Sequence, residues 1–157
     1  MLLTSMTADD LAEHLFDVAN QLNRAVTLLI DHDEKVKVAG VDLRVGRKAK
    51  ASAAYASARE YFAAGMGLLE GTDWSSQYEL TFSLWLGRAE CELLCGNSEK
   101  AGQLIEQLLL RAASKVDEAA VYCLKVQLQI MKSEYQQAVT TAPVSYTHLT
   151  LPTNREV

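Results

Sequence analysis

The distribution of proline is the feature of this sequence that most restricts its fold. The two prolines are Pro143 and Pro152, so the first 142 of the 157 residues contain none. Folds rich in strands need frequent turns, which proline and glycine usually supply. The proline-free stretch is instead rich in Ala, Leu, Glu, Lys and Gln, residues that favour helices. The sequence therefore predicts an all-α fold.

Composition and charge exclude several classes of protein. Hydrophobic residues make up 49% of the chain and charged residues 22%, an ordinary globular balance, and the net charge of −5 argues against a nucleic-acid partner. No apolar run approaches the ~18 residues that span a bilayer, so we expect no membrane insertion. The three cysteines cannot all pair and form no metal-type cluster, which favours a reducing, cytoplasmic location.

The last residues differ in character from the rest of the chain. Residues 143–153 are polar and β-branched and have no helical period. Codon by codon, they resemble a translated sequencing-library adapter of the transposon type. We therefore expect residues 143–157 to be a non-native tail, which is excluded from fold reasoning, and the native chain to continue differently after about Ala142.

Apolar residues recur at helical spacing along most of the chain. The first expected helix ends near Ile30, within a lead-in segment, residues 1–32, that continues from an upstream domain. Residues 33–142 are expected to form irregular helical hairpins. The helices expected there lie at about residues 34–45, 51–69, 78–93, 101–112 and 116–130, and a further one begins near Glu134.

Self-comparison of the sequence shows a recurring pair of small residues five positions apart. The pairs are Gly46 with Ala51, Gly96 with Ala101, and Ser133 with Ala138. We expect each first residue to end a helix at a turn and each alanine to open the packing face of the next helix. This predicts stacked antiparallel hairpins, an α-solenoid fragment.

The spacing around the second pair resembles the tetratricopeptide (TPR) pattern. Trp85, Ala89 and Ile105, together with Gly96 and Ala101, have the bulky, small and turn character that this repeat requires. Arg88 and Glu92 stand where apolar residues are usual, so the likeness is partial. The expected architecture is therefore TPR-like.

Three longer strings carry a more specific resemblance. They are residues 15–24 (LFDVANQLNR), residues 41–58 (VDLRVGRKAKASAAYASA), and residues 78–82 with 88–92 (YELTF and RAECE). They resemble the helical-repeat segment of large bacterial signalling proteins that join a serine/threonine kinase domain, a predicted AAA-type ATPase domain, helical repeats, a sensory domain and often a histidine kinase of two-component systems. The resemblance implies that Met1 is internal and that the parent protein is an ATP-binding kinase. It also implies that the catalytic residues lie outside this segment.

Residues with the chemistry for catalysis or cofactor binding do not converge in the sequence. The nearest approach to a phosphate loop ends Gly46-Arg47-Lys48-Ala49, which has the wrong glycine spacing and no hydroxyl for magnesium. Cys91 and Cys95 share a helix face but lack the further ligands that zinc needs. We therefore expect no catalytic residue, no cofactor and no metal in this segment.

A basic cluster is the strongest candidate for a binding surface. Four of its members, Arg44, Arg47, Lys48 and Lys50, follow one another closely in an otherwise acidic chain, with Lys35 and Lys37 before them. Such a run suits an acidic partner or a phosphate-bearing surface, although it is also typical of a solvated hairpin rim. Polar residues late in the first helix, Asn20, Gln21, Asn23 and Arg24, are expected to hydrogen-bond to a neighbouring helix or to close the junction to the preceding domain.

Two functions remain open at this point. The first is a non-catalytic regulatory segment of a large signalling protein, which contacts the neighbouring domains of its own chain and a protein partner. The alternative is a stand-alone TPR-like adaptor. A small helical enzyme would need convergent ligands or a nucleophile–base pair, and the sequence shows neither.

Overall fold

The computed structural model describes the backbone of residues 8–28 and 31–150, and side chains from residue 13 to residue 140 within those ranges. Every regular element in this part of the chain is helical, as the sequence predicts. The helices are α1 (Ala8–Arg24), a 3₁₀ turn η1 (Val26–Leu28), α2 (His32–Ala51), α3 (Tyr55–Leu68), α4 (Asp73–Ser76), α5 (Tyr78–Leu94), α6 (Ser98–Arg111) and α7 (Lys115–Thr150).

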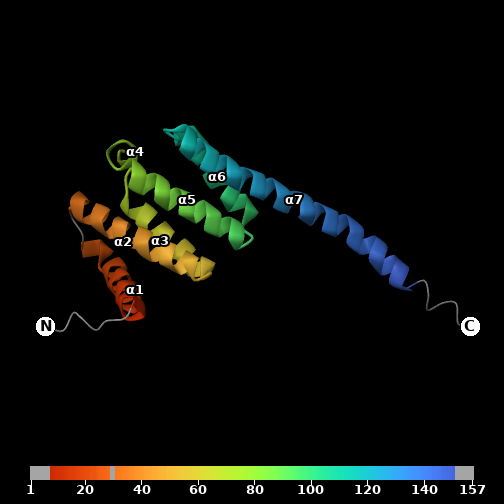
Figure 1. The fold of residues 1–157 in the computed structure, drawn as a ribbon, viewed down its shortest axis with the longest axis horizontal. Coiled ribbons are helices and arrows are strands. Elements are labelled where there is room, and N and C mark those ends of the chain that lie inside the picture. The colour runs from red at the N-terminus through yellow and green to blue at the C-terminus, as the bar shows by residue number, and fades with distance from the viewer. Residues whose placement is uncertain (1–7, 29–30, 151–157) are drawn as a thin grey trace, which may run out of the picture.

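The helices pack mainly against their neighbours in the chain. Figure 1 shows α1 at one end of the body and α7 projecting from the other end. Between them, α2, α3, α5 and α6 follow in the order of the chain. Because the helices pack mainly on their neighbours in the chain, with further contacts from α2 to α5 and from α5 to α7, the array resembles a short solenoid. The first helix ends at Arg24, short of the expected end near Ile30, and residues 29–30 lie outside the described residues.

Helix α5 is the central element because it contributes to both hydrophobic clusters. Phe82 and Leu93 pack in a cluster with α6 and α7, whereas Leu84 and Cys91 pack in a cluster with α2 and α3. All four side chains are at most 5% exposed. The two clusters therefore meet along one helix, which makes the hairpins a continuous body.

The turn expected at Gly96 is present between α5 and α6. Gly96 has φ +82°, a left-handed conformation that favours glycine, and its amide donates to the Leu93 carbonyl. Ala101 is completely buried one turn into α6 and faces the cluster with α7. The small-residue pair at this position therefore has the geometry that the repeat pattern describes.

The turn expected at Gly46 is wrong. Helix α2 continues through Gly46 to Ala51, which is exposed at the helix end and does not open α3. The chain instead reverses at residues 52–54, where Ala53 adopts φ +58°. Residues 47–51 are good helix formers, so the absence of a side chain at Gly46 serves packing and does not end the helix.

Phe62 on α3 explains why Gly46 has no side chain. A Cβ atom at Gly46 would lie 2.6 Å from Phe62 Cε1, and one at Gly87 of α5 would lie 2.7 Å from Phe62 Cζ. Real Cβ atoms essentially never approach so closely. The two glycines therefore let α2 and α5 both close onto the Phe62 ring, which is 1% exposed.

Replacing Gly46 by alanine is expected to destabilise the protein although alanine is the better helix former. Overpacking against Phe62 lowers the free energy of unfolding by about 1–3 kcal/mol. Gly40 lies in the same helix with open space at its Cβ position, so Gly40→Ala raises it by up to about 1 kcal/mol. Urea unfolding followed by circular dichroism compares the two variants, and equal stabilisation by both would contradict the packing role of Gly46.

The break expected at Ser133 is also wrong. Helix α7 runs without interruption from Lys115 to Thr150, so Ser133 lies inside it and Ala138 lies on an exposed part of the same helix. The helix also crosses the expected boundary after Ala142. A serine in a helix interior is tolerated when no turn residue follows it, and Glu134 to Gln137 continue the helix. The non-native origin of residues 143–157 stays a prediction.

Candidate functional site

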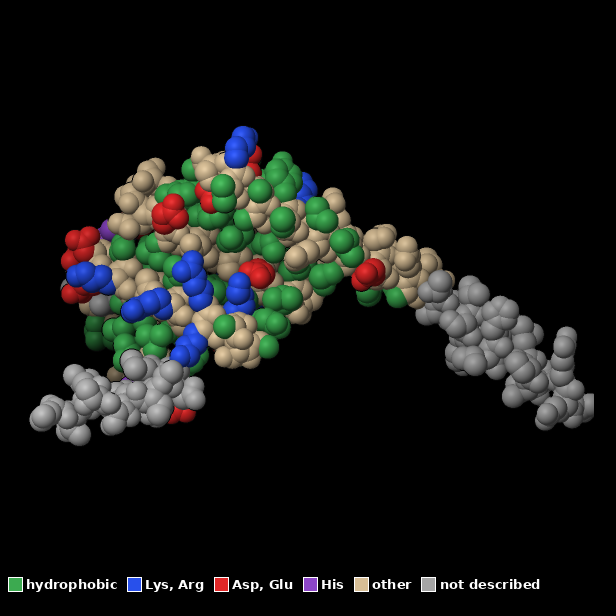
Figure 2. All heavy atoms as spheres, in the orientation of Figure 1, with side chains coloured by type: hydrophobic (Ala, Val, Ile, Leu, Met, Phe, Trp, Pro, Cys, Tyr) green, Lys and Arg blue, Asp and Glu red, His purple; other side chains and the backbone are tan. Residues whose placement is uncertain are grey.

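The basic cluster lies on α2, where two of its members, Arg47 and Lys50, are engaged by α5. Lys50 Nζ lies 2.6 Å from Glu90 Oε2, and Arg47 donates a hydrogen bond of 3.3 Å to the Ser83 hydroxyl. Figure 2 shows Lys and Arg side chains gathered over the α2–α3 end of the body with an acidic side chain beside them. The cluster is therefore partly neutralised from within the fold.

Two further members of the basic cluster, Arg44 and Lys48, have no side-chain partner in the part of the chain that the structure describes. Arg44 is exposed and Lys48 is half-buried, one turn apart on the same face of α2. Two cations at this spacing can meet one acidic group of a partner. Their role in binding stays a proposal.

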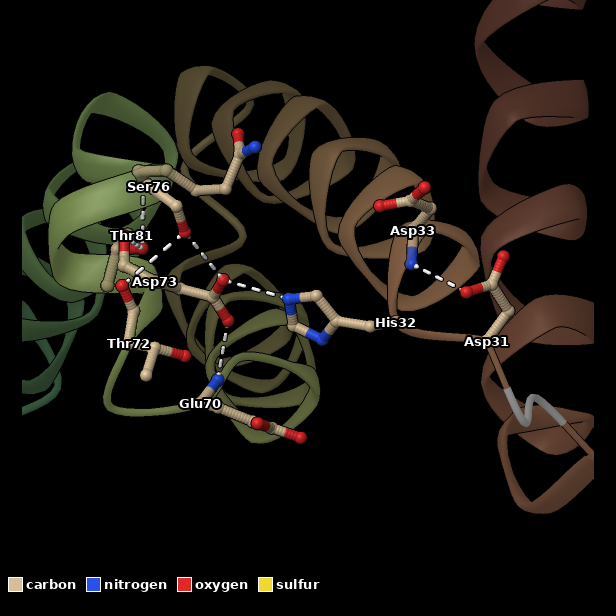
Figure 3. A network of polar contacts seen from close by, with 9 residues as sticks. Asp31, His32, Asp33, Glu70, Thr72, Asp73, Ser76 and Thr81 are labelled. Carbon is tan, nitrogen blue, oxygen red and sulfur yellow. Dashed lines mark hydrogen bonds and ion pairs between the residues drawn. The ribbon is translucent and has the colours of Figure 1, made fainter.

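A buried polar network joins the start of α2 to the linker before α5. Asp73 is completely buried and accepts hydrogen bonds from the Glu70 amide, from His32 Nε2 at 2.9 Å and from the Ser76 hydroxyl at 3.2 Å. Figure 3 shows these groups pointing toward the Asp73 carboxylate. Burial alone would raise the pKa of Asp73, but the three hydrogen bonds and the charge of His32 hold it below its usual value.

A second buried carboxylate, Glu92, stands where the TPR-like pattern expected from the sequence calls for an apolar residue. Glu92 is 5% exposed, and Arg59 and Arg88 lie 3.6 Å and 3.5 Å from its oxygens. Asn97, next to the Gly96 turn, donates to Glu92 Oε2 at 2.7 Å. The departure from the TPR pattern is thus a structural ion pair that connects α3, α5 and the α5–α6 turn.

Two of the polar residues late in α1, Asn20 and Asn23, make cross-helix contacts of the kind that the sequence predicts. Tyr61 of α3 donates a 3.0 Å hydrogen bond to Asn20 Oδ1, and Asn23 Nδ2 donates a 2.8 Å bond to Asp42 of α2. Asp42 is completely buried. Burial raises the pKa of Asp42 to about 6, against a smaller opposite effect of the Asn23 hydrogen bond.

The aromatic residues around α5 form a structural junction. The rings of Trp74 and Trp85 lie 5.4 Å apart, and the Arg111 guanidinium lies 4.9 Å and 5.7 Å from their centroids. The Tyr78 hydroxyl donates to Asp117 at 2.8 Å and accepts from the Ala113 amide. These contacts fix the α6–α7 turn against α5.

The cysteines do not come together with other ligands. Cys91 is buried, Cys95 is half-buried and Cys123 is exposed on α7. Among the described side chains, no group of three or more His, Cys, Asp or Glu residues is arranged to hold a metal ion. Burial raises the pKa of the Cys91 thiol to about 11, so this thiol is not an activated nucleophile.

Helix α7 leaves exposed the side that the apolar spacing of residues 116–130 marks, which includes Val126 and Ile130. One side, with Val121, Leu124 and Leu128, is buried against α6. On the other side Tyr122, Val126 and Ile130 follow one another at four-residue spacing and are each at least half exposed. We call these three residues the outer stripe.

The side of α7 that packs on α6 continues beyond the end of α6. Helix α7 is about 54 Å long and α6 about 21 Å, at 1.5 Å per residue, so α7 overhangs α6. Met131 and Tyr135 lie on this overhang and are 36% and 72% exposed. With Gly96, Ser98, Lys132 and Gln136 they line a hollow of about 450 Å³ beside the α5–α6 turn.

The described residues therefore form an all-α array of packed hairpins in which the last helix, α7, is buried on one side and exposed on the other. No helix in the described part of the chain is long and apolar enough to cross a membrane. No known family model matches the sequence, and neither does any solved structure. The likeness to tetratricopeptide repeats stays a prediction.

One curated protein is similar to this chain. Over 114 residues, 67% of the chain, the sequence is 30% identical to hybrid signal transduction histidine kinase G of Dictyostelium discoideum. The chain spans 3% of that protein's length. The similarity supports a relation to signalling proteins, as the resemblance implies. Because this relative is not bacterial, a bacterial source stays a prediction.

Proposed function

We propose that this chain is a non-catalytic, TPR-like helical segment of a larger signalling protein. It transmits signals by rigid contact between neighbouring domains of the parent chain, and it binds a protein partner. The parent would be an ATP-binding kinase, of the histidine type that the relative's name describes, of the serine/threonine type, or both, with an AAA-type ATPase domain. The expected location is the cytoplasm.

The outer stripe is the observation that carries this proposal. An α-helix with two apolar sides is typical of a helix covered on both sides. Within the described residues α6 covers one side of α7, and Tyr122, Val126 and Ile130 remain open on the other. Helix α6 packs on one side of α7. A further helical hairpin that packed in the same way on the opposite side would bury the outer stripe and extend the array.

The proposal needs no chemistry within the segment. The buried carboxylates Asp73 and Glu92 are held by hydrogen bonds or ion pairs within the fold. These contacts fix the positions of the helices relative to one another. A segment held in this way is suited to act as a rigid spacer between domains. Arg44 and Lys48 provide a cationic surface away from α7 on which an acidic segment of a partner would bind.

Self-association of the isolated chain tests the role of the outer stripe. Exposed apolar faces drive association, so we expect the helical chain to associate increasingly with concentration in sedimentation-velocity experiments. The double variant Val126→Glu, Ile130→Glu is expected to weaken this association at least about tenfold, because each charge must be desolvated on contact.

A matched control is the exposed Leu110 of α6, which is 79% exposed. Leu110→Glu introduces the same negatively charged side chain outside the outer stripe and is expected to leave the self-association unchanged. Circular dichroism would check that all variants keep their helix content. A wild-type chain that stays monomeric at all concentrations, or equal effects of both variants, would contradict the proposed packing surface.

A further inference from the structure

The contact between α1 and α2 contains two buried acceptors without donors. Asn23 Nδ2 donates to Asp42 Oδ1, which leaves Asp42 Oδ2 and Asn23 Oδ1. Both of these oxygens are buried and have no hydrogen-bond partner in the structure. Buried polar atoms are usually satisfied, and an unpaired carboxylate oxygen is among the most costly groups to leave unpaired.

A single proton satisfies both atoms. A protonated carboxyl group carries one O–H donor, whereas an ionised one only accepts. Protonated at Oδ2, Asp42 can donate to Asn23 Oδ1 while it accepts from Asn23 Nδ2. The acid and the amide then form a closed pair of two hydrogen bonds, in which no oxygen of either side chain lacks a partner.

We propose that Asp42 is a neutral carboxylic acid while α1 is packed on α2, and that loss of its proton loosens α1, which makes this contact a proton-sensitive joint. The inference is independent of the proposed function, because it concerns a contact within the fold. The raised pKa of Asp42, which burial brings to about 6, is consistent with it.

No cation among the described residues offsets a negative charge on Asp42. On the elements packed around it, Arg59 of α3 and Arg88 of α5 contact Glu92, and Lys50 of α2 contacts Glu90. On α1, Asp17 and Arg24 are exposed and make no ion pair.

Among the described residues, the uncharged groups around Asp42 offer no hydrogen-bond donor apart from Asn23. A Cβ atom added at Gly65 of α3 would lie 3.2 Å from the Asp42 Cβ atom, so α3 passes close to Asp42. Glycine, however, has no side chain that could donate a hydrogen bond. The Tyr61 hydroxyl donates to Asn20, one turn earlier on α1. Deprotonation would therefore leave a buried charge with one hydrogen bond, which is an unfavourable state.

The sign of the pH effect follows from the direction of the pKa shift. The pKa of Asp42 is higher in the folded protein than its ordinary value of 3.8, so the folded state binds this proton more tightly. The attachment of α1 is therefore strongest below about pH 4 and weakens as the pH rises through about 6. The contact between the Phe16 and Tyr61 rings, with centroids 5.8 Å apart, does not involve Asp42 and keeps α1 near the body.

Two measurements on the full chain test the joint. Carboxyl ¹³C NMR would titrate the aspartates, with the Asp42 signal assigned by its loss in Asp42→Asn. Hydrogen exchange by mass spectrometry, at low concentration and corrected for intrinsic rates, would compare α1 at pH 5 and pH 7.5. We expect Asp42 to titrate near 6, and the protection of α1 to fall by about tenfold from pH 5 to pH 7.5 while that of α5 changes less.

The Asp42→Asn variant mimics the protonated acid, because its amide donates to Asn23 and accepts from it. We expect it to keep the protection of α1 at pH 7.5, whereas Asp17→Asn, an exposed control on α1, behaves as the wild type. Titration of Asp42 near 4, or protection of α1 that does not depend on pH, would overturn the proposal. If Asp42→Asn fails to fold, the wild-type titration and exchange still decide.

Discussion

Replacing Phe62 by alanine is expected to lower the free energy of unfolding by about 3–5 kcal/mol. The Phe62 ring fills the space between three helices, and the neighbouring backbone at Gly46 and Gly87 has no side chain that can move into the cavity. Because the site cannot collapse easily, the cost lies toward the upper end of the range for large-to-small changes. Urea unfolding followed by circular dichroism measures it.

An exposed aromatic residue provides the control for Phe62→Ala. Tyr122 of α7 is 53% exposed, and Tyr122→Ala is expected to change the free energy of unfolding by less than about 0.5 kcal/mol at concentrations where the chain is monomeric. A loss below about 1 kcal/mol for Phe62→Ala would show that α2, α3 and α5 do not close onto the ring.

Replacing Asp73 by alanine is expected to lower the free energy of unfolding by about 3 kcal/mol. The change removes the acceptor of three hydrogen bonds, leaves the Glu70 amide without its partner and detaches His32 at the start of α2. Asp73→Asn keeps one acceptor oxygen and the side-chain volume, so we expect roughly half of that loss. Chemical unfolding at pH 7 compares the two variants.

The pH dependence separates the Asp73 network from a general packing defect. The pKa of Asp73 lies below its ordinary value, so its contribution is complete above about pH 4 and is lost as the pH falls further. The wild type and Asp73→Ala are therefore expected to differ less at pH 2.5 than at pH 7. A constant difference across this range would contradict an ionised Asp73 in the folded protein.

The sequence predicts the fold class and one turn correctly for identifiable reasons. The absence of proline and the helical spacing of apolar residues reflect the helices directly. Gly96 is followed by Asn97 and Ser98, which favour the start of a helix, and the turn lies there. Gly46 has no such residues after it, and this local signal distinguishes the two glycines even though their spacing to the next alanine is the same.

Other features depend on contacts between distant residues. The turn at Ala53 has no glycine or proline to mark it, and its position follows from the packing of Phe62 against Gly46. Asp42 and Asp73 look like ordinary surface charges in the sequence, and each is buried by helices that are distant in the chain. The polar character of α1 around Asn23 was the available signal for one of these contacts, but it did not identify Asp42.

The predicted surface sites also depend on contacts between distant residues, which local sequence signals do not show. The basic cluster was identified by local charge density, which does not reveal that Glu90 neutralises Lys50. The outer stripe was contained in the apolar spacing of residues 116–130, but only the position of α6 shows which side of α7 remains open. An exposed side of a helix is a property of the assembly of helices, and a single sequence does not display it.

A long sequencing read of the source DNA through both ends of this reading frame tests the central claim most directly. We expect the frame to continue upstream of Met1 into an ATP-binding domain of a signalling protein. Beyond Ala142 we expect further helical-repeat codons in place of residues 143–157. A start signal directly before Met1, with a stop codon shortly after Ala142, would contradict the claim that this chain is a segment of a larger kinase, and would leave a stand-alone adaptor.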